Sequence, residues 1–235
     1  MSAVRHPYVE LVEPRLEGAA RDWFRLRTAE LGPRNFAASF AAVGRRAGAA
    51  PVQLARAETA VIEAASLPLP LGWPLATVAR AGWLGELGTR LDASEFYALV
   101  VGQFKTGDNG ERVAISRALQ LLPDPVRFVD LAIDACRSHV QDVFEAIACE
   151  NPYPARHFPE ANFNQLVLKA FFIQVEVRRI AGLQARITPE LVRMANAYAS
   201  ERRAAGRSVP SDLESVTLAP SPEGSPDPHA RGASS

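Results

Sequence analysis

The most informative stretch of the chain is PVRFVDLAIDACRSHVQDVFEAIAC, residues 125–149. At about 100° per residue, its apolar side chains fall on one arc of a helical wheel and its charged side chains on the opposite arc. Pro125 suits the first position of a helix, and Arg127/Asp130 and Asp134/Arg137 have the i,i+3 spacing of surface ion pairs. The pattern predicts one amphipathic helix over residues 125–149.

Two polar residues disturb this pattern. His139 and Glu150 fall at the edge of the apolar arc, where a polar group without a partner costs about 1–3 kcal/mol. Each would therefore need a partner. Alternatively, Ser138 caps a second helix with Gln141 at its N3 position, which breaks the helix and turns His139 elsewhere. Both alternatives stay open at the level of sequence.

The rest of the chain is also helical in pattern. Asp92 and Glu95 have the spacing of a capping box, and Thr188-Pro189 followed by Gly206 marks the start and end of another helix. No run alternates between polar and apolar residues, so we expect no sheet. We predict an all-α fold of consecutive antiparallel helices, either a small HEAT-like α-solenoid or a closed helical bundle.

Composition excludes several classes of protein. The chain has 235 residues with 26 Lys+Arg against 26 Asp+Glu, so it lacks the basic excess typical of a nucleic-acid binder. Its two cysteines are too few for a disulfide framework and suit a reducing compartment. The longest uncharged run, residues 64–79, is too short to span a membrane and contains helix-breaking prolines. We expect a cytoplasmic protein without a transmembrane segment, and leave peripheral membrane contact open.

Residue usage divides the chain into three zones. Residues 1–92 are rich in Ala, Leu and Arg, residues 93–206 carry the candidate site, and residues 207–235 are rich in Pro, Ser and Gly. We predict that the last zone is disordered, because it has too few apolar groups to offset its ordering entropy. In the first zone, the Leu-rich segment around Trp73 predicts either a buried loop between helices or a surface for docking a partner.

Lysine is rare in this chain, with two lysines against 24 arginines among the 26 basic residues. Lys105 precedes the turn TGDNGER, where its charge and that of Arg112 would suit an anionic group. Alternatively, Asp108 and Asn109 simply cap the next helix. The second lysine, Lys169, lies between apolar triplets, so we expect a buried stem and a carboxylate partner.

A proline-rich segment, NPYPARHFPEANFNQ, follows residue 150; its prolines predict a rigid, extended connection, and Asn162, Asn164 and Gln165 stand at the start of the next helix. Its polar and aromatic groups could line a site, or the aromatics could fill the core while the amides cap helices. A zinc site is not expected, because Cys136 lies in the core arc and Cys149 on the other side of the helix. Carboxylates on neighbouring helical turns could hold Mg²⁺ instead.

The candidate site residues therefore form three groups. Proton carriers or catalytic groups are His139, His157 and Lys169. Ligand-binding candidates are Lys105, Asp108, Asn109, Arg112, Arg137, Asn151, Tyr153, Asn164 and Gln165. Metal-ligand candidates are Asp142, Glu145 and Glu150.

Residues 102–173 resemble the EboA-domain family of bacterial proteins, most distinctively in the words GDNGER, DVFEAIACENPYPA and HFPE. The resemblance continues through RITPELVRMANAYASERRAAGRSVP. It implies a helical protein encoded with a prenyltransferase, a sugar-phosphate cyclase, a metal-dependent hydrolase and a phosphodiesterase-like protein. It implies a part in making or moving a small metabolite, with no settled reaction for this component.

Two functional hypotheses follow. In the first, the protein binds a pathway intermediate or assembles the other enzymes of the same gene cluster without catalysis. In the second, it is an enzyme of that pathway acting on a phosphorylated or prenylated intermediate, with Mg²⁺ as a candidate cofactor. The second hypothesis requires His139, His157, Asp142, Glu145 and Lys169 to converge within about 8 Å in a closed cleft.

Overall fold

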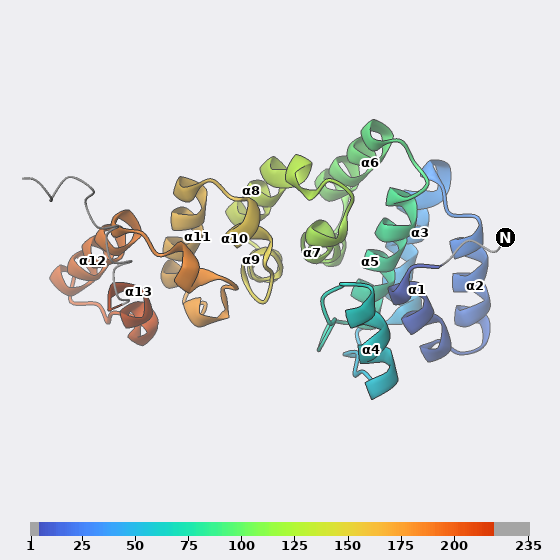
Figure 1. Ribbon diagram of the computed structural model, residues 1–235, viewed down its shortest axis with the longest axis horizontal. Helices are drawn as coiled ribbons and strands as arrows, with labels where there is room; N and C mark the ends of the chain where they lie inside the picture. The colour runs from blue at the N-terminus through green and yellow to red at the C-terminus, as the bar shows by residue number, and fades with distance from the viewer. Residues whose placement is uncertain (1–4, 219–235) are drawn as a thin grey trace, which may run out of the picture. The chain divides into compact units, whose positions relative to one another are not determined.

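The computed structural model describes residues 5–218, and within that range the fold is all-α, as predicted. An isolated antiparallel β-bridge joins Pro51 and Pro74. By their contacts, the residues fall into two compact units: unit 1 ends at Phe158 and unit 2 begins at Pro159 (Figure 1).

The N-terminal half of unit 1 is built around one buried helix, α5 (Leu75–Gly88). Gly82 lets α1 approach closely, because a Cβ there would lie 3.0 Å from the backbone nitrogen of Val9. The helices that precede α5 are α1 (Pro7–Val12), α2 (Gly18–Ala29), α3 (Pro33–Ala47) and α4 (Arg56–Ala64), with a 3₁₀ turn, η1 (Glu13–Arg15), after α1. Of these, α1 and α3 make the main contacts with α5.

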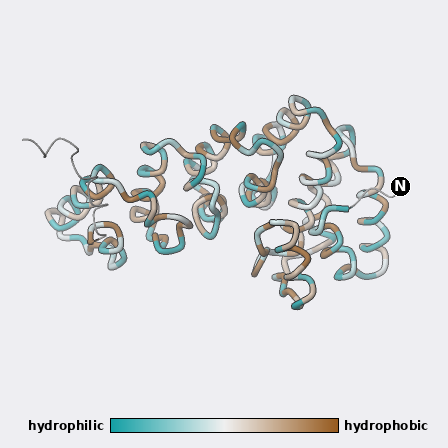
Figure 2. Tube along the Cα trace, in the orientation of Figure 1, coloured by the Kyte–Doolittle hydropathy of each residue, from teal (hydrophilic) through white to brown (hydrophobic). Residues whose placement is uncertain are grey.

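The second half of unit 1 consists of helices stacked in chain order. They are α6 (Ala93–Thr106), α7 (Asn109–Ala118), η2 (Leu119–Leu121), η3 (Pro125–Phe128), α8 (Val129–Arg137), α9 (Gln141–Ala148) and α10 (Tyr153–His157). Helix α7 packs against α5 on one side and α9 on the other, with α6 and α8 beside it. This neighbour-to-neighbour order favours the solenoid form of the predicted fold over a closed bundle within unit 1. Figure 2 shows apolar and polar residues interleaved along these helices, as one-sided burial requires.

Of the two alternatives for residues 125–149, the structure shows the broken helix and not the continuous one, and the N-cap of α9 is Val140, not Ser138. A 3₁₀ turn leads into α8, which ends at Arg137, and α9 begins at Gln141. In the break, the Ser138 hydroxyl oxygen accepts a hydrogen bond from the N–H of Val140 at 3.1 Å. The break lets α8 and α9 pack against each other, so the apolar arc is still buried. His139 and Glu150 are exposed, and neither carries the burial cost expected for the continuous helix.

The proline-rich segment after residue 150 is not fully extended, contrary to the prediction. It contains α10, with Pro152 at the N-cap and Pro154 in the first turn. Proline is tolerated there because the first N–H groups of a helix have no intrahelical acceptor. The prolines therefore start a short helix instead of preventing one.

Unit 2 contains α11 (Glu160–Phe172) and α12 (Pro189–Ala204), joined through the 3₁₀ turns η4 (Val177–Arg179) and η5 (Leu183–Arg186). Thr188 caps α12 as predicted, since its hydroxyl accepts from the N–H of Leu191. Gly206 lies just beyond this helix at φ 64°, the left-handed region that favours glycine. The predicted N-cap Asp92 of α6 is likewise confirmed.

The predicted disordered tail began at residue 207, but residues 211–217 form η6 (Ser211–Leu213) and α13 (Glu214–Thr217). Leu213 and Val216 are buried, and the carboxylate of Asp212 accepts a hydrogen bond from the N–H of Val177 at 2.7 Å. These few contacts order a segment whose composition is polar. Residues 219–235, the rest of the predicted tail, lie outside the described residues.

The Leu-rich segment before α5 is mostly a buried connection. Trp73 is only 8% exposed: the ring of Tyr8 meets it edge-on at 6.1 Å, and the guanidinium of Arg117 lies 5.1 Å from its centroid. Leu71 is exposed. Trp73, the largest side chain of the predicted docking surface, is therefore buried and cannot contact a partner. Over residues 5–218, no helix combines the length and the apolar character needed to cross a membrane.

Candidate functional site

The turn between α6 and α7 is a self-contained helix cap. The carboxylate of Asp108 accepts from the N–H of Glu111 at 2.8 Å, and the carboxylate of Glu111 accepts from the N–H of Asp108 at 2.8 Å. Asn109 is the exposed first residue of α7. Two N–H groups that an anion would need are therefore occupied by the protein's own carboxylates. This geometry favours the capping interpretation of Asp108 and Asn109 over a phosphate-binding turn.

A buried arginine from α5 lies beneath this cap. Arg80 is 4% exposed, and its Nε donates to the carbonyl oxygen of Phe40 at 2.9 Å. Burial lowers the pKa of Arg80, and the negative charges of Glu111 and Asp108 partly oppose that shift. A Cβ on Gly110 would lie 3.3 Å from Nη1 of this guanidinium, so the second glycine of GDNGER leaves space for the cation.

A groove of about 330 Å³ opens beside the cap, between α6 and α8. Tyr97, Val101 and Phe104, spaced i, i+4 and i+7, present one face of α6 to it, and Leu131 of α8 adds a further apolar group. All three α6 residues are half-buried. The volume is at the lower end of the range of about 300–1,000 Å³ typical of small-molecule sites.

Two sequence-predicted residues, Lys105 and Arg112, lie together at this groove. Arg112 is held in place because its Nε donates to the carbonyl oxygen of Phe104 at 3.1 Å and its Nη2 to that of Lys105 at 3.2 Å. Both acceptors are in the last turn of α6, where helix carbonyls lack regular partners and favour a cation. Lys105 is exposed, and within residues 5–218 no acidic side chain pairs with its ammonium group.

The wall formed by α8 carries the opposite charge. Asp130 and Asp134 line it, both exposed. Asp134 forms an ion pair with the predicted ligand residue Arg137 at 3.4 Å, a contact exposed to solvent on both sides. The groove thus combines an apolar floor, two cations from α6 and α7, and two carboxylates from α8.

Three other predicted residues have structural positions in unit 1. Asn151 is 5% exposed and uses its amide for three hydrogen bonds within the protein. Tyr153 is buried, which raises its pKa, and its hydroxyl donates to the carbonyl oxygen of Pro125 at 2.5 Å. His157 packs on Tyr153 with ring centroids 4.7 Å apart, and its Nε2 lies 3.2 Å from Oε1 of Gln120. Burial, and to a lesser extent the charge of Arg156, lowers the pKa of His157.

The predicted acid–base and metal residues do not gather at the groove. His139 lies on the exposed turn before α9, and Asp142 is exposed on the first turn of α9. Glu145 accepts a hydrogen bond from the amide of Gln141 at 2.7 Å, and Glu150 is exposed at a left-handed φ of 50°. Across the described residues, no group of three or more His, Cys, Asp or Glu side chains is arranged to hold a metal ion.

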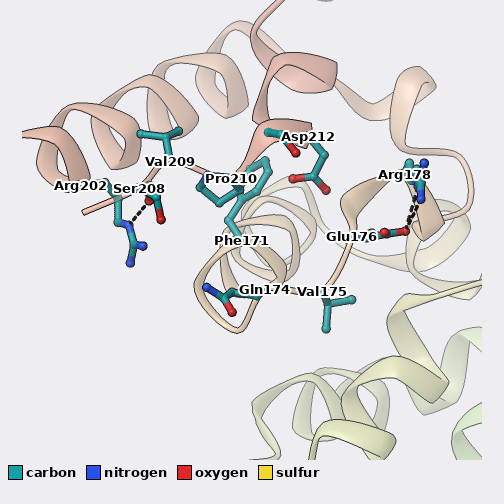
Figure 3. Close-up of a pocket in the computed structure, with 11 residues that line it drawn as sticks. Phe171, Gln174, Val175, Glu176, Arg178, Arg202, Ser208, Val209, Pro210 and Asp212 are labelled. Atoms are coloured by element: carbon teal, nitrogen blue, oxygen red, sulfur yellow. Dashed lines mark hydrogen bonds and ion pairs between the residues drawn. The ribbon is translucent and has the colours of Figure 1, made fainter. Parts of the chain in front are cut away.

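In unit 2, the predicted residues all belong to α11. Asn164 is 2% exposed, and its side-chain oxygen has no hydrogen-bond partner among the described residues. Gln165 is exposed and Lys169 is half-buried. None of the three lines the cavity of about 400 Å³ near the end of α11 (Figure 3). Figure 3 shows that this cavity is bordered by polar groups already in use: Arg202 donates to the carbonyl oxygen of Ser208, and Arg178 pairs with Glu176.

Several residues of the α6–α8 groove carry no signal in the sequence that marks them as part of a site. Tyr97, Val101 and Phe104 belong to the segment EFYALVVGQF, whose i, i+4, i+7 spacing indicates a helix face but not whether a core or a groove covers it. Asp130 was assigned only to a surface ion pair, and Arg80 had no distinguishing signal. Their position at or beneath the site depends on the packing of helices that are distant in sequence.

Comparison with known proteins places this arrangement in a family. A family model described as metabolite traffic protein EboA matches residues 10–217 and so includes the groove, the cap and Arg80. No curated protein and no solved structure matches the chain significantly. Because the family match covers most of its length, the chain belongs to the EboA family of metabolite traffic proteins.

Proposed function

We propose that this chain is a non-catalytic binding component in the traffic of a small metabolite, and that the metabolite lies in the α6–α8 groove. The observation that carries the proposal is the composition of the groove. Its floor is apolar, while Lys105 and Asp130 at its rim form no ion pair with other described residues. Pockets that combine an apolar surface with placed polar groups are typical of small-molecule sites.

The positions of the candidate catalytic residues support binding over catalysis. General acid–base catalysis needs groups within hydrogen-bond reach of the reacting atoms. His157 is committed to Tyr153 and Gln120, whereas His139 and Asp142 are exposed away from the groove lining. None of the residues predicted as proton carriers or metal ligands lines the groove.

The proposal can be tested by filling the groove. Val101 is half-buried in its floor, so Val101→Trp places an indole where a ligand would lie. The matched control is Val61→Trp, which alters an exposed valine in a separate surface hollow between α1 and α4. The full chain would be titrated with the neutral probe 2-naphthalenemethanol and followed by NMR chemical shifts.

We expect saturable binding that Val101→Trp reduces about tenfold or more and Val61→Trp leaves unchanged, since an indole occupies much of a cavity of this size. If both variants bind the probe equally, or if the NMR chemical shifts change linearly without saturation, the groove is not the binding site. Both variants must show the wild-type helical circular dichroism for the comparison to count.

A further inference from the structure

The charges of the α6–α8 groove lie on different helices. Lys105 and Arg112 come from the end of α6 and from α7, while Asp130 and Asp134 come from α8. A ligand that spans the groove therefore meets cations on one side and carboxylates on the other. This asymmetry is a property of the fold, because the chain as a whole has equal numbers of basic and acidic residues.

The cationic side is the better prepared of the two to hold a ligand. The guanidinium of Arg112 is fixed by two backbone carbonyl groups through Nε and Nη2, and Nη1 remains available as a donor. Lys105 is the adjacent ammonium, and no described carboxylate neutralises it. A donor that is already held in place loses little conformational entropy when it binds an anion.

The acidic side restricts the number of negative charges a ligand can carry. A second anionic group reaching across the groove would approach Asp130, and only Asp134 is neutralised, by Arg137. Like charges repel. A polyanion such as a diphosphate therefore fits poorly, whereas hydroxyl groups could donate hydrogen bonds to Asp130.

We infer that the groove selects a small apolar molecule with a single negative charge, its anionic group at Lys105 and Arg112 and its apolar body on Tyr97, Val101 and Phe104. This inference rests on the proposed function, since it names the class of ligand for the same groove. Lys105 and Arg112 select the charge of the ligand, and the α6 face supplies the affinity for its apolar body.

Three matched probes test the inference: naphthalene-2-sulfonate, 2-naphthalenemethanol and 2-naphthylmethylammonium, each titrated into the full chain. We expect the sulfonate to bind about five- to tenfold more tightly than the neutral probe, because one partly exposed charge contact contributes about that factor. Lys105→Ala should reduce this preference by at least about twofold, since Arg112 remains, and leave the affinity for the neutral probe within about twofold. Arg34→Ala, at an exposed arginine of α3 outside the groove, is the control for general charge effects.

The outcomes separate the two proposals. If the neutral probe binds in the groove but the sulfonate has no advantage, or if the ammonium probe binds best and Asp130→Asn weakens it, the charge inference is overturned while the binding function stands. If no probe responds to Val101→Trp, the proposed function fails first. Raising the salt concentration should weaken the sulfonate alone, because salt screens exposed charge contacts.

Discussion

Asn151, which the sequence suggested as a ligand-binding residue, is expected to be one of the most destabilising positions to change. Its Nδ2 donates to the carbonyl oxygens of Ser116 at 3.1 Å and Ala146 at 3.0 Å, and its Oδ1 accepts from the N–H of Tyr153 at 3.0 Å. The two carbonyls lie in the last turns of α7 and α9, and Tyr153 begins α10. One buried amide thus serves three helix ends, which lack regular partners within their own helices.

The magnitude follows from these contacts. Asn151→Ala deprives two buried acceptors and one buried donor of a partner, and a buried group left unsatisfied costs about 1–3 kcal/mol. Allowing for partial relaxation, we expect the free energy of unfolding to fall by about 3–5 kcal/mol. Asn151→Asp should be worse at neutral pH, because a carboxylate would face the carbonyl oxygens of Ser116 and Ala146.

The Asp variant also carries a pH signature. Burial beside two carbonyls favours the protonated carboxyl, so the folded-state pKa of the introduced Asp should lie above its unfolded value of about 4. The stability of Asn151→Asp should therefore be greatest at acidic pH and fall as pH rises through that raised pKa. The slope would be absent in Asn151→Ala.

Urea unfolding followed by circular dichroism measures these changes, with Asn196→Ala, at an exposed asparagine of α12, as the control. We expect the control to lie within about 0.5 kcal/mol of wild type. A loss below about 1 kcal/mol for Asn151→Ala, or equal stability of the Ala and Asp variants at neutral pH, would refute the structural role of this amide.

Three further predictions concern stability and are measured by the same unfolding assay. Gly107→Ala should destabilise the protein strongly, because the added Cβ would lie 2.5 Å from Oε2 of Glu111 and 2.6 Å from a backbone oxygen of α6. Gly102→Ala, with open space around it inside α6, should instead raise the free energy of unfolding by about 0.5–1 kcal/mol. The reverse order of stability would contradict the cap geometry. Arg80→Met should lower the free energy of unfolding by about 3–5 kcal/mol, because the buried Glu111 loses its nearby cation. The double variant Arg80→Met/Glu111→Gln should recover part of that loss, and purely additive effects would argue against coupling between the two residues. Because the folded-state pKa of His157 is lowered, the unfolded state takes up a proton at higher pH than the folded state does. The contribution of His157 to the free energy of unfolding is therefore complete above about pH 6.5 and is lost as pH falls. His157→Gln should flatten part of the slope of stability against pH, and an unchanged slope would count against the assignment.

Short-range features of the fold were predictable because their causes lie within a few residues. Asp92 and Thr188 cap their helices as expected, since a side-chain oxygen reaches an N–H only two or three residues away. The helix break at Ser138 was one of two alternatives that local signals allowed. The break allows α8 and α9 to pack against each other, and the residue spacing within a single segment does not specify such packing.

The candidate site was predictable only in part. Lys105 stood out because lysine is rare, and Arg112 because it ends the GDNGER turn that follows Lys105; the two do lie together at the groove. Asn151 and Tyr153 were chosen by residue type, but the structure uses their polar atoms to join helices. A polar side chain in a rigid loop has the same sequence signature whether it meets a ligand or a neighbouring backbone.

The amino-acid order alone was enough to establish an all-α chain, the position of its main caps and its family resemblance, because period and capping are local and the family words are contiguous. Packing was needed to decide which helix faces are covered and which remain open. Arg80 lies under the cap because α5 packs against α7, and Lys105 and Asp130 line the same groove because α6 and α8 both pack beside α7. Burial and charge pairing depend on those long-range contacts, which no short segment specifies.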